Sequence, residues 1–179
     1  MSEIHTETDE IWLSSDDLET VRGRVPMVYV EAVPVRLDEF GQVTHIGLLL
    51  RAMPDGTISR AIVSGRVLWG ETLRHALSRH LDKDLGPAAF PRIPASPVPF
   101  TVAEYMQDPT ATGFHDPRQH AVSLAYVVPM QGECVPSLDA LEFAWLTCEE
   151  AAGVDVSAEM TGGQDRLVRL ALAHTGRLP

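Results

Sequence analysis

The feature that most constrains the fold is one helical pattern in the middle of the chain, with strand-like segments on both sides. Within residues 71–84, Leu73, Ala76, Leu77 and Leu81 fall on one arc of a helix. The pattern stops before Gly86-Pro87, a pair typical of a helix exit. A helix with one apolar arc must cover a sheet or another helix. The chain therefore favours an α+β fold.

The remaining segments complete this prediction. We expect a short capped helix at 14–19, strands at 25–37, 43–51, 57–63, 98–106, 120–130 and 141–146, and a closing helix at 163–174. Pro34 is predicted to interrupt the first strand. Turns are expected at 38–41 and 53–56, and residues 86–100, with five prolines, read as a connecting loop.

Charge is distributed unevenly along the chain. The 179 residues carry a formal net charge of −11, of which −7 lies in residues 1–20. Without a basic stripe, double-stranded nucleic acid is excluded as a partner, whereas a small anionic ligand held by local cations is allowed. No apolar run approaches the ~18 residues that span a membrane. The two cysteines cannot build a disulfide framework, and the polar start does not read as a secretory signal, so we expect a cytoplasmic protein.

Residues 65–87, GRVLWGETLRHALSRHLDKDLGP, carry a recognisable spacing. Gly65, Glu71, Arg79, Leu81 and Gly86 stand where the Nudix box, G-x5-E-x7-R-E-U-x-E-E-x-G-U with U a bulky aliphatic, requires them. The chain thus resembles the Nudix hydrolase family (MutT-like domains) over about residues 25–175. The resemblance implies an α/β/α sandwich around a mixed β-sheet. We assign residues 1–22 to an acidic segment and 23–179 to the Nudix-like domain.

The family resemblance implies hydrolysis of a nucleoside diphosphate linked to another moiety, with Mg²⁺ or Mn²⁺ as cofactor. Metal neutralises the pyrophosphate and activates water. Here His80, Lys83 and Asp84 stand where the family has three glutamates. Only Asp84 keeps a carboxylate, and imidazole suits Mg²⁺ poorly. We therefore expect weak metal binding and weak or lost pyrophosphohydrolase activity, with the ammonium of Lys83, the only lysine, replacing a missing cation.

The resemblance also suggests residue roles. Glu71, Arg79 and Asp84 correspond to the catalytic set, although for the first two we favour a structural ion pair. Asp84 and His80 are the candidate metal ligands. They fall inside the apolar arc, either as a pair in a remnant cavity or at a helix end that emerges into water.

Candidate ligand contacts lie both in and beyond the box. Lys83, Arg118 and His120 are predicted to bind substrate anions, with a surface salt bridge as the alternative for Arg118. Glu104 and Glu133 are further carboxylates that could serve a metal.

Three functions remain open at this point. The first is a metal-dependent hydrolase with an altered site. The second is a domain that has lost hydrolysis and binds a small anionic nucleotide-like ligand. The third is a structural or regulatory dimer. A homodimer is what the resemblance implies, and a fold alone does not choose among these functions.

Overall fold

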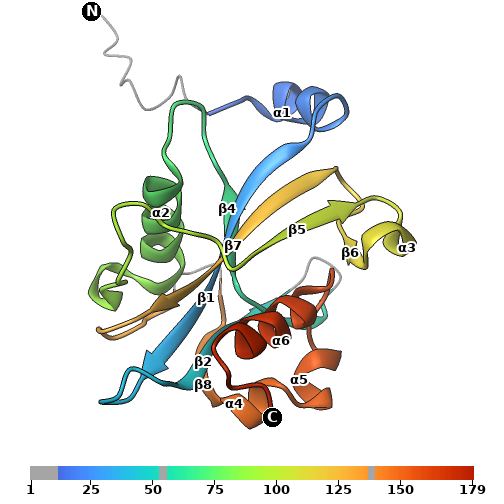
Figure 1. Ribbon diagram of the computed structural model, residues 1–179. Coiled ribbons are helices and arrows are strands. Elements are labelled where there is room, and N and C mark those ends of the chain that lie inside the picture. The colour runs from blue at the N-terminus through green and yellow to red at the C-terminus, as the bar shows by residue number, and fades with distance from the viewer. Residues whose placement is uncertain (1–11, 53–55, 137–139) are drawn as a thin grey trace, which may run out of the picture.

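The computed structural model describes residues 12–52, 56–136 and 140–179, and it has an α+β fold around one mixed sheet (Figure 1). The strands are β1 (Met27–Leu37), β2 (Val43–Ala52), β3 (Ile58–Ala61), β4 (Val63–Arg66), β5 (Thr101–Met106), β6 (Phe114–His115), β7 (Ala121–Pro129) and β8 (Glu142–Thr147). The helices are α1 (Ser15–Arg22), α2 (Leu73–Leu85), α3 (Pro109–Thr112), α4 (Cys148–Ala151), α5 (Val154–Ala158) and α6 (Gln164–His174), with a 3₁₀ turn, η2, at Pro87–Ala89. The predicted turn at 53–56 falls largely outside the described residues.

The sheet is organised around β1. Its main path runs β3-β2-β1-β7-β5-β6, with β4 added to β1 and β8 added to β2. The pairs β1–β7 and β5–β6 are parallel, and the other pairs are antiparallel. Along one edge, β1 pairs first with β4 and then with β2, so the sheet forks at this strand.

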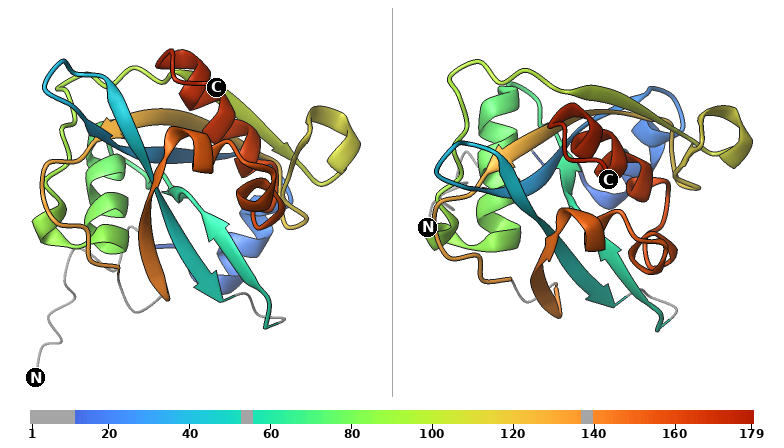
Figure 2. Two further views of the ribbon diagram at one scale, coloured as in Figure 1. Left: turned by 90° about the horizontal axis from the view of Figure 1, so that it is seen from below. Right: turned by 60° about the horizontal axis from the view of Figure 1, so that its bottom comes forward.

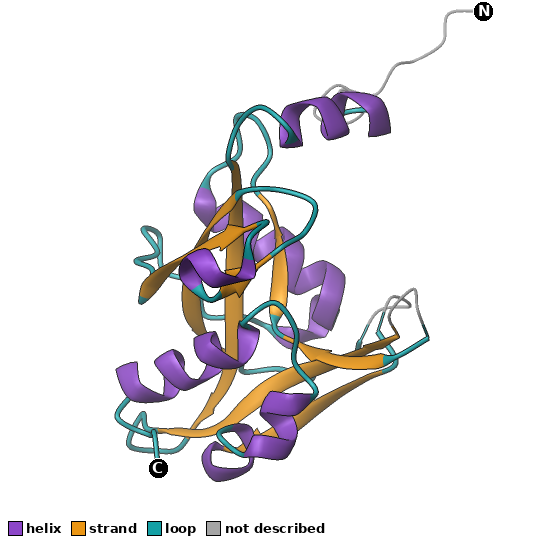
Figure 3. Cartoon of the chain, turned by 90° about the vertical axis from the view of Figure 1, so that its right-hand side faces the viewer, coloured by secondary structure: helices purple, strands orange, loops and turns teal. Residues whose placement is uncertain are grey.

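Helices cover both sides of the central strands. Helix α2 contacts β4 and β1, whereas α6 contacts β7. The strands run between α2 and the C-terminal helices in both views of Figure 2, and Figure 3 shows helices on either side of the sheet. This arrangement confirms the predicted α/β/α sandwich.

The hydrophobic core follows the alternation of β1. Val30 and Ala32 point into the cluster beneath α2, whereas Val33 and Val35 point into the cluster beneath α6. Because successive side chains of a strand face opposite sides, one strand supplies both cores.

Two predicted boundaries are wrong. The single strand predicted at 57–63 is two strands, β3 and β4, which break at Ile62, where the backbone N–H donates to Gln164 Oε1. Pro34 does not interrupt β1. Along this edge of β1, the pairing with β4 ends at Ala32 and the pairing with β2 begins at Val35. The missing N–H of Pro34 therefore falls in the gap between two partners.

Across the described segments, no helix is both long and apolar enough to cross a membrane.

Candidate functional site

Helix α2 brings most of the predicted site residues together. Its N-cap, Thr72, accepts a hydrogen bond from the backbone N–H of His75 at 3.2 Å, and its exit residue Gly86 has φ +80°. This positive φ explains the glycine at that position. Ala76, Leu77 and Leu81 of the predicted apolar arc are buried, Leu73 is partly buried, and His80 and Asp84 are buried with them.

Glu71 and Arg79 form the expected ion pair. Arg79 donates through Nε and Nη2 to the two carboxylate oxygens, each at 2.7 Å, and through Nη2 to Arg66 O at 2.9 Å. Burial alone would raise the pKa of Glu71, but hydrogen bonds from Arg79 and from the backbone N–H of Leu68 outweigh it and lower the pKa. The pair ties the loop before α2 to the body of the helix.

His80 lies against the end of β4. Its Nε2 donates to Arg66 O at 2.9 Å, which fixes the proton on that nitrogen. Burial lowers the pKa of His80, and this outweighs the hydrogen bond to Arg66. The imidazole is therefore held as a neutral hydrogen-bond donor through Nε2, which leaves its lone pair on Nδ1.

Asp84 is held by a partner from another strand. Arg51 Nη2, near the end of β2, donates to Asp84 Oδ2 at 2.7 Å, and the carboxylate side chain is only 3% exposed. Neither reading of the sequence anticipated this arrangement. His80 and Asp84 bond to different partners rather than to each other, and both side chains are buried although Asp82 and Lys83 beside them are exposed.

A hollow on the outer side of β4 and α2 gathers positive charge. We call it the cationic hollow. It has a volume of about 560 Å³ and is lined by Trp12, Tyr29, Ser64, Gly65, Arg66, Arg79, His80, Asp82 and Lys83. The guanidinium carbons of Arg66 and Arg79 lie 5.8 and 5.5 Å from the Trp12 ring centroid. Lys83 thus lies in a basic environment with an aromatic wall.

A second cavity, the polar cleft, has a volume of about 640 Å³. Its lining comes from strands β1 to β7, the loop before β7 and the start of α6. Its polar lining includes Glu31, Arg51, Ser59, Ser64, Tyr105, His115, Asp116, Arg118, Gln119, Ser123 and Gln164. Tyr29 and Ser64 line both this cleft and the cationic hollow, so the two cavities adjoin.

The two anion contacts predicted outside the box, Arg118 and His120, lie in different places. Arg118 lines the polar cleft and makes a bidentate contact with Asp116, at 2.9 Å from both Nε and Nη2. This pair raises the pKa of Arg118. His120 lies outside both linings and bonds through Nε2 to Glu104 Oε1 at 2.9 Å. Glu133 is exposed and lines neither cavity.

Sequence reasoning missed most of the polar cleft, including two of its charged residues. Arg51 gave no local signal, because its contact with Asp84 crosses 33 positions. Glu31 did give a signal: it is one carboxylate within the apolar strand VYVEAVPV. A charged residue inside a buried strand indicates a polar cavity.

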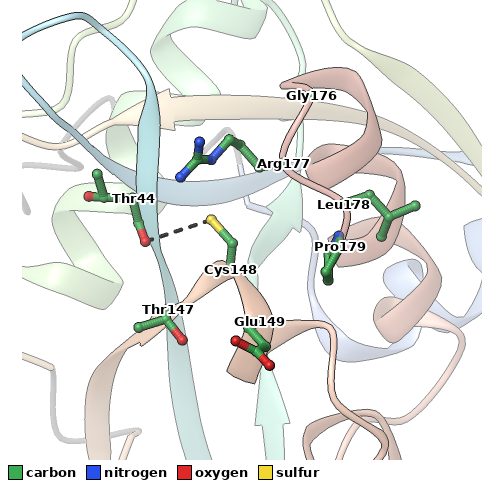
Figure 4. A pocket seen from close by; sticks show the side chains of 8 residues that line it. All are labelled: Thr44, Thr147, Cys148, Glu149, Gly176, Arg177, Leu178 and Pro179. Carbon is green, nitrogen blue, oxygen red and sulfur yellow. Dashed lines mark hydrogen bonds between the residues drawn. The ribbon is translucent and has the colours of Figure 1, made fainter.

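A further hollow near the C-terminus has no connection to the predicted residues (Figure 4). Cys148 is one of its lining residues, and its thiol lies 3.7 and 3.6 Å from the carbonyl oxygens of Val43 and Thr44. Arg177 and Glu149 are the charged side chains of its lining.

Comparison with solved structures supports the fold. The chain is 59% identical to a possible asymmetric diadenosine tetraphosphate (Ap4A) hydrolase from Jonesia denitrificans, with 87% of this chain and 98% of that chain covered and a TM-score of 0.85. The NUDIX domain of Shewanella oneidensis NrtR, in complex with ADP ribose, is 14% identical, with 97% and 98% covered and a TM-score of 0.59. A C. elegans Ap4A hydrolase is also 14% identical, with 84% and 98% covered and a TM-score of 0.60.

These likenesses confirm the predicted resemblance: the chain has the fold of the Nudix hydrolases. More specifically, the chain belongs to the family described as "Domain of unknown function (DUF4916)", whose model matches residues 8–177. Comparison with curated proteins gives no match.

Proposed function

We propose that the protein binds a nucleoside-diphosphate-like ligand across the cationic hollow and the polar cleft, and that it hydrolyses such ligands weakly or not at all. The observation that carries this proposal is the ion pair between Arg51 and Asp84 at 2.7 Å. The one carboxylate left among the three altered box positions is already neutralised by a guanidinium. The guanidinium of Arg51 thus balances the negative charge of Asp84 that a bound metal ion would otherwise balance.

Nudix hydrolases generally use Mg²⁺ or Mn²⁺, but the donors near α2 do not fit such an ion. Magnesium prefers several oxygen ligands in octahedral geometry. Asp84 is engaged by Arg51, His80 Nε2 is engaged by Arg66 O, and Lys83 adds a cation on the same helix. Among the residues placed by the structure, no three His, Cys, Asp or Glu side chains converge on one point.

The charge of the two cavities suits a ligand with phosphates at one end. Lys83 and Arg66 line the cationic hollow and suit phosphate oxygens, whereas Trp12 offers a flat apolar surface. Arg118 provides a further cation in the adjoining cleft. ADP ribose in the NrtR complex and the Ap4A hydrolases among the similar structures support a ligand that contains a nucleoside diphosphate. His120, bonded to Glu104 outside both cavities, is proposed as a more distant contact.

Calorimetric titration tests binding. We expect ADP and ADP ribose to bind equally well with EDTA or with Mg²⁺. Lys83→Ala should weaken ADP binding by about tenfold, the value of one charge-assisted hydrogen bond. Arg74→Ala is the matched control, because it removes an exposed cation from the same helix outside both linings. Equal effects of the two variants, or no binding of ADP or ADP ribose, would refute the proposal.

Turnover is tested with ADP ribose and Ap4A in the presence of Mg²⁺ or Mn²⁺. We expect slow or undetectable hydrolysis, since the box carboxylates act as a unit around the metal. Brisk metal-dependent cleavage that Asp84→Ala abolishes would contradict the proposal. If Lys83→Glu creates metal-dependent cleavage, this result directly supports the idea that the ammonium of Lys83 takes the place of a bound metal ion.

A homodimer also remains a proposal. It is checked by sedimentation of the 19.6 kDa chain, in which a mass near twice that value is expected. The alternative function is a non-catalytic regulatory or structural dimer. It would be favoured if the dimer formed but neither ADP nor ADP ribose raised the melting temperature, because a ligand that prefers the native state must stabilise it.

We also propose a cytoplasmic location, where the free cysteines Cys134 and Cys148 would stay reduced.

A further inference from the structure

Glu31 occupies an unusual position for an acidic residue. It lies in the middle of β1, between β4 and β7, and is 2% exposed. Its carboxyl group belongs to the lining of the polar cleft. None of the functional roles assigned above uses this group.

The two oxygens of Glu31 have different surroundings. Oε1 accepts hydrogen bonds from Tyr105 Oη at 2.8 Å and from Gln164 Nε2 at 3.2 Å. Oε2 is buried and has no hydrogen-bond partner within the described part of the chain, and the same holds for the nearby Ser123 Oγ. The cleft therefore has two unsatisfied polar atoms in its lining, which is costly unless something binds there.

This environment favours the neutral form of the Glu31 carboxyl group. Burial raises the pKa of Glu31, and the neighbouring hydroxyl and amide groups of Ser123, Tyr105, Gln164 and Ser64 offset that only in part. Because Oε1 already accepts two hydrogen bonds, the proton belongs on Oε2. A protonated Oε2 can donate a hydrogen bond, and no described residue accepts one from it.

We propose that Glu31 is a specificity-determining residue, whose Oε2–H donates to an uncharged acceptor, a ring nitrogen or a carbonyl oxygen, on a nucleobase-like group in the polar cleft. This inference rests on the proposed function and adds the orientation of the ligand. Phosphates favour the cationic hollow over the polar cleft, because Glu31 in the cleft, whether ionised or neutral, offers them no positive charge. Tyr29 and Ser64 border both cavities, so a single ligand can reach from one into the other.

The cleft has the capacity for such a group. Its volume of about 640 Å³ lies within the range of small-molecule sites. The two arginines of the lining are each paired with a carboxylate, Arg51 with Asp84 and Arg118 with Asp116, so the cleft suits an uncharged ligand group. The hydroxyl of Ser123 can both donate and accept, and so provides a second contact for the edge of a heteroaromatic ring.

The test compares the affinities of ADP and inorganic pyrophosphate by calorimetric titration. Glu31→Met removes the donor, and we expect ADP binding to fall by about tenfold while pyrophosphate binding is unchanged. Glu31→Gln places an amide NH₂ at the Oε2 position, so its ADP affinity should stay within about threefold of the unaltered protein. Glu142→Gln, in the exposed first position of β8, is the matched control and should change neither affinity.

Glu31→Asp keeps the test decisive if Glu31→Met does not fold, because it withdraws the acid by one methylene and should also weaken ADP selectively. An unchanged ratio of ADP to pyrophosphate affinity in Glu31→Met or Glu31→Asp would overturn the inference and leave the proposed function standing. A tenfold loss of ADP affinity in Glu31→Gln would overturn it too, because Glu31 would then act as an ionised acceptor. If the unaltered protein binds neither ADP nor pyrophosphate, the proposed function itself fails.

Discussion

Individual side chains near α2 are fixed by charge-assisted hydrogen bonds, and the pair of Glu71 and Arg79 is the clearest case. Glu71→Gln should lower the free energy of unfolding by about 1–2 kcal/mol, because it leaves the half-buried guanidinium without its counter-charge. Urea unfolding at neutral pH measures this loss, with Glu142→Gln as the exposed control. Equal midpoints for the two variants would show that the pair contributes nothing.

The same pair has a pH signature. The pKa of Glu71 is lowered in the folded state, so its contribution is fully present above the ordinary value of 4.5. It is lost as the pH falls through the lowered pKa. The difference in stability between the unaltered protein and Glu71→Gln should therefore shrink in acid.

Glu31 should show the opposite dependence. Its pKa is raised by burial, so its contribution is present below the unfolded value of 4.5 and is lost as the pH rises through the folded-state pKa. Glu31→Gln does not titrate, and its stability relative to the unaltered protein should increase above pH 4.5, by up to about 1 kcal/mol per pH unit, before levelling off. Urea unfolding measured between pH 4 and 9 checks this. A difference that is flat across that range would contradict a raised pKa.

The family resemblance predicted the one pair of site residues whose partners are near in sequence. Glu71 and Arg79 are eight positions apart and belong to one loop and helix, so the ion pair was foreseeable. Arg51 reaches Asp84 from another strand, and Glu31 meets Tyr105 and Gln164 across 74 and 133 positions. Contacts of that range depend on the strand order, which the spacing of the box does not encode.

At the scale of elements, α2 and β4 approach each other closely through Gly65. A Cβ at this position would lie 1.8 Å from Cε1 of His80, well inside contact distance. Gly65→Ala should therefore push α2 away from β4 and destabilise the protein by about 2 kcal/mol or more. Thermal unfolding measures the loss. Adding His80→Ala should restore part of it, and a double variant no more stable than Gly65→Ala would refute the steric explanation.

Element boundaries show where sequence patterns are sufficient and where they are not. The predicted helix at 71–84 closely matches α2, because its capping and apolar arc are local properties. The break between β3 and β4 was not predicted, because it arises when two successive segments pair with different strands, β2 and β1. The short helices α3 and α5 were missed for a different reason. With four and five residues, they have too few positions to show a helical period.

At the scale of the whole molecule, β1 and β7 belong to both cores. In β7, Ala121 and Ala125 face the core beneath α6, whereas Tyr126 and Val128 face the core beneath α2. Neither core can open without disturbing strands that the other core needs. The described fold should therefore unfold as one cooperative unit.

Leu81 and Leu167, each fully buried in a different core, test this cooperativity. Leu81→Ala and Leu167→Ala should each cost about 2–5 kcal/mol, the usual loss for a leucine truncated in a packed interior. Each variant should shift the entire transition, so that fluorescence and circular dichroism report the same midpoint and the calorimetric enthalpy equals the van't Hoff enthalpy. If the two cores were independent, either truncation would split the transition, with one phase left at the original temperature. Shared strands forbid that outcome, since truncating a side chain on one face of the sheet lowers the stability of the strands that hold the other face.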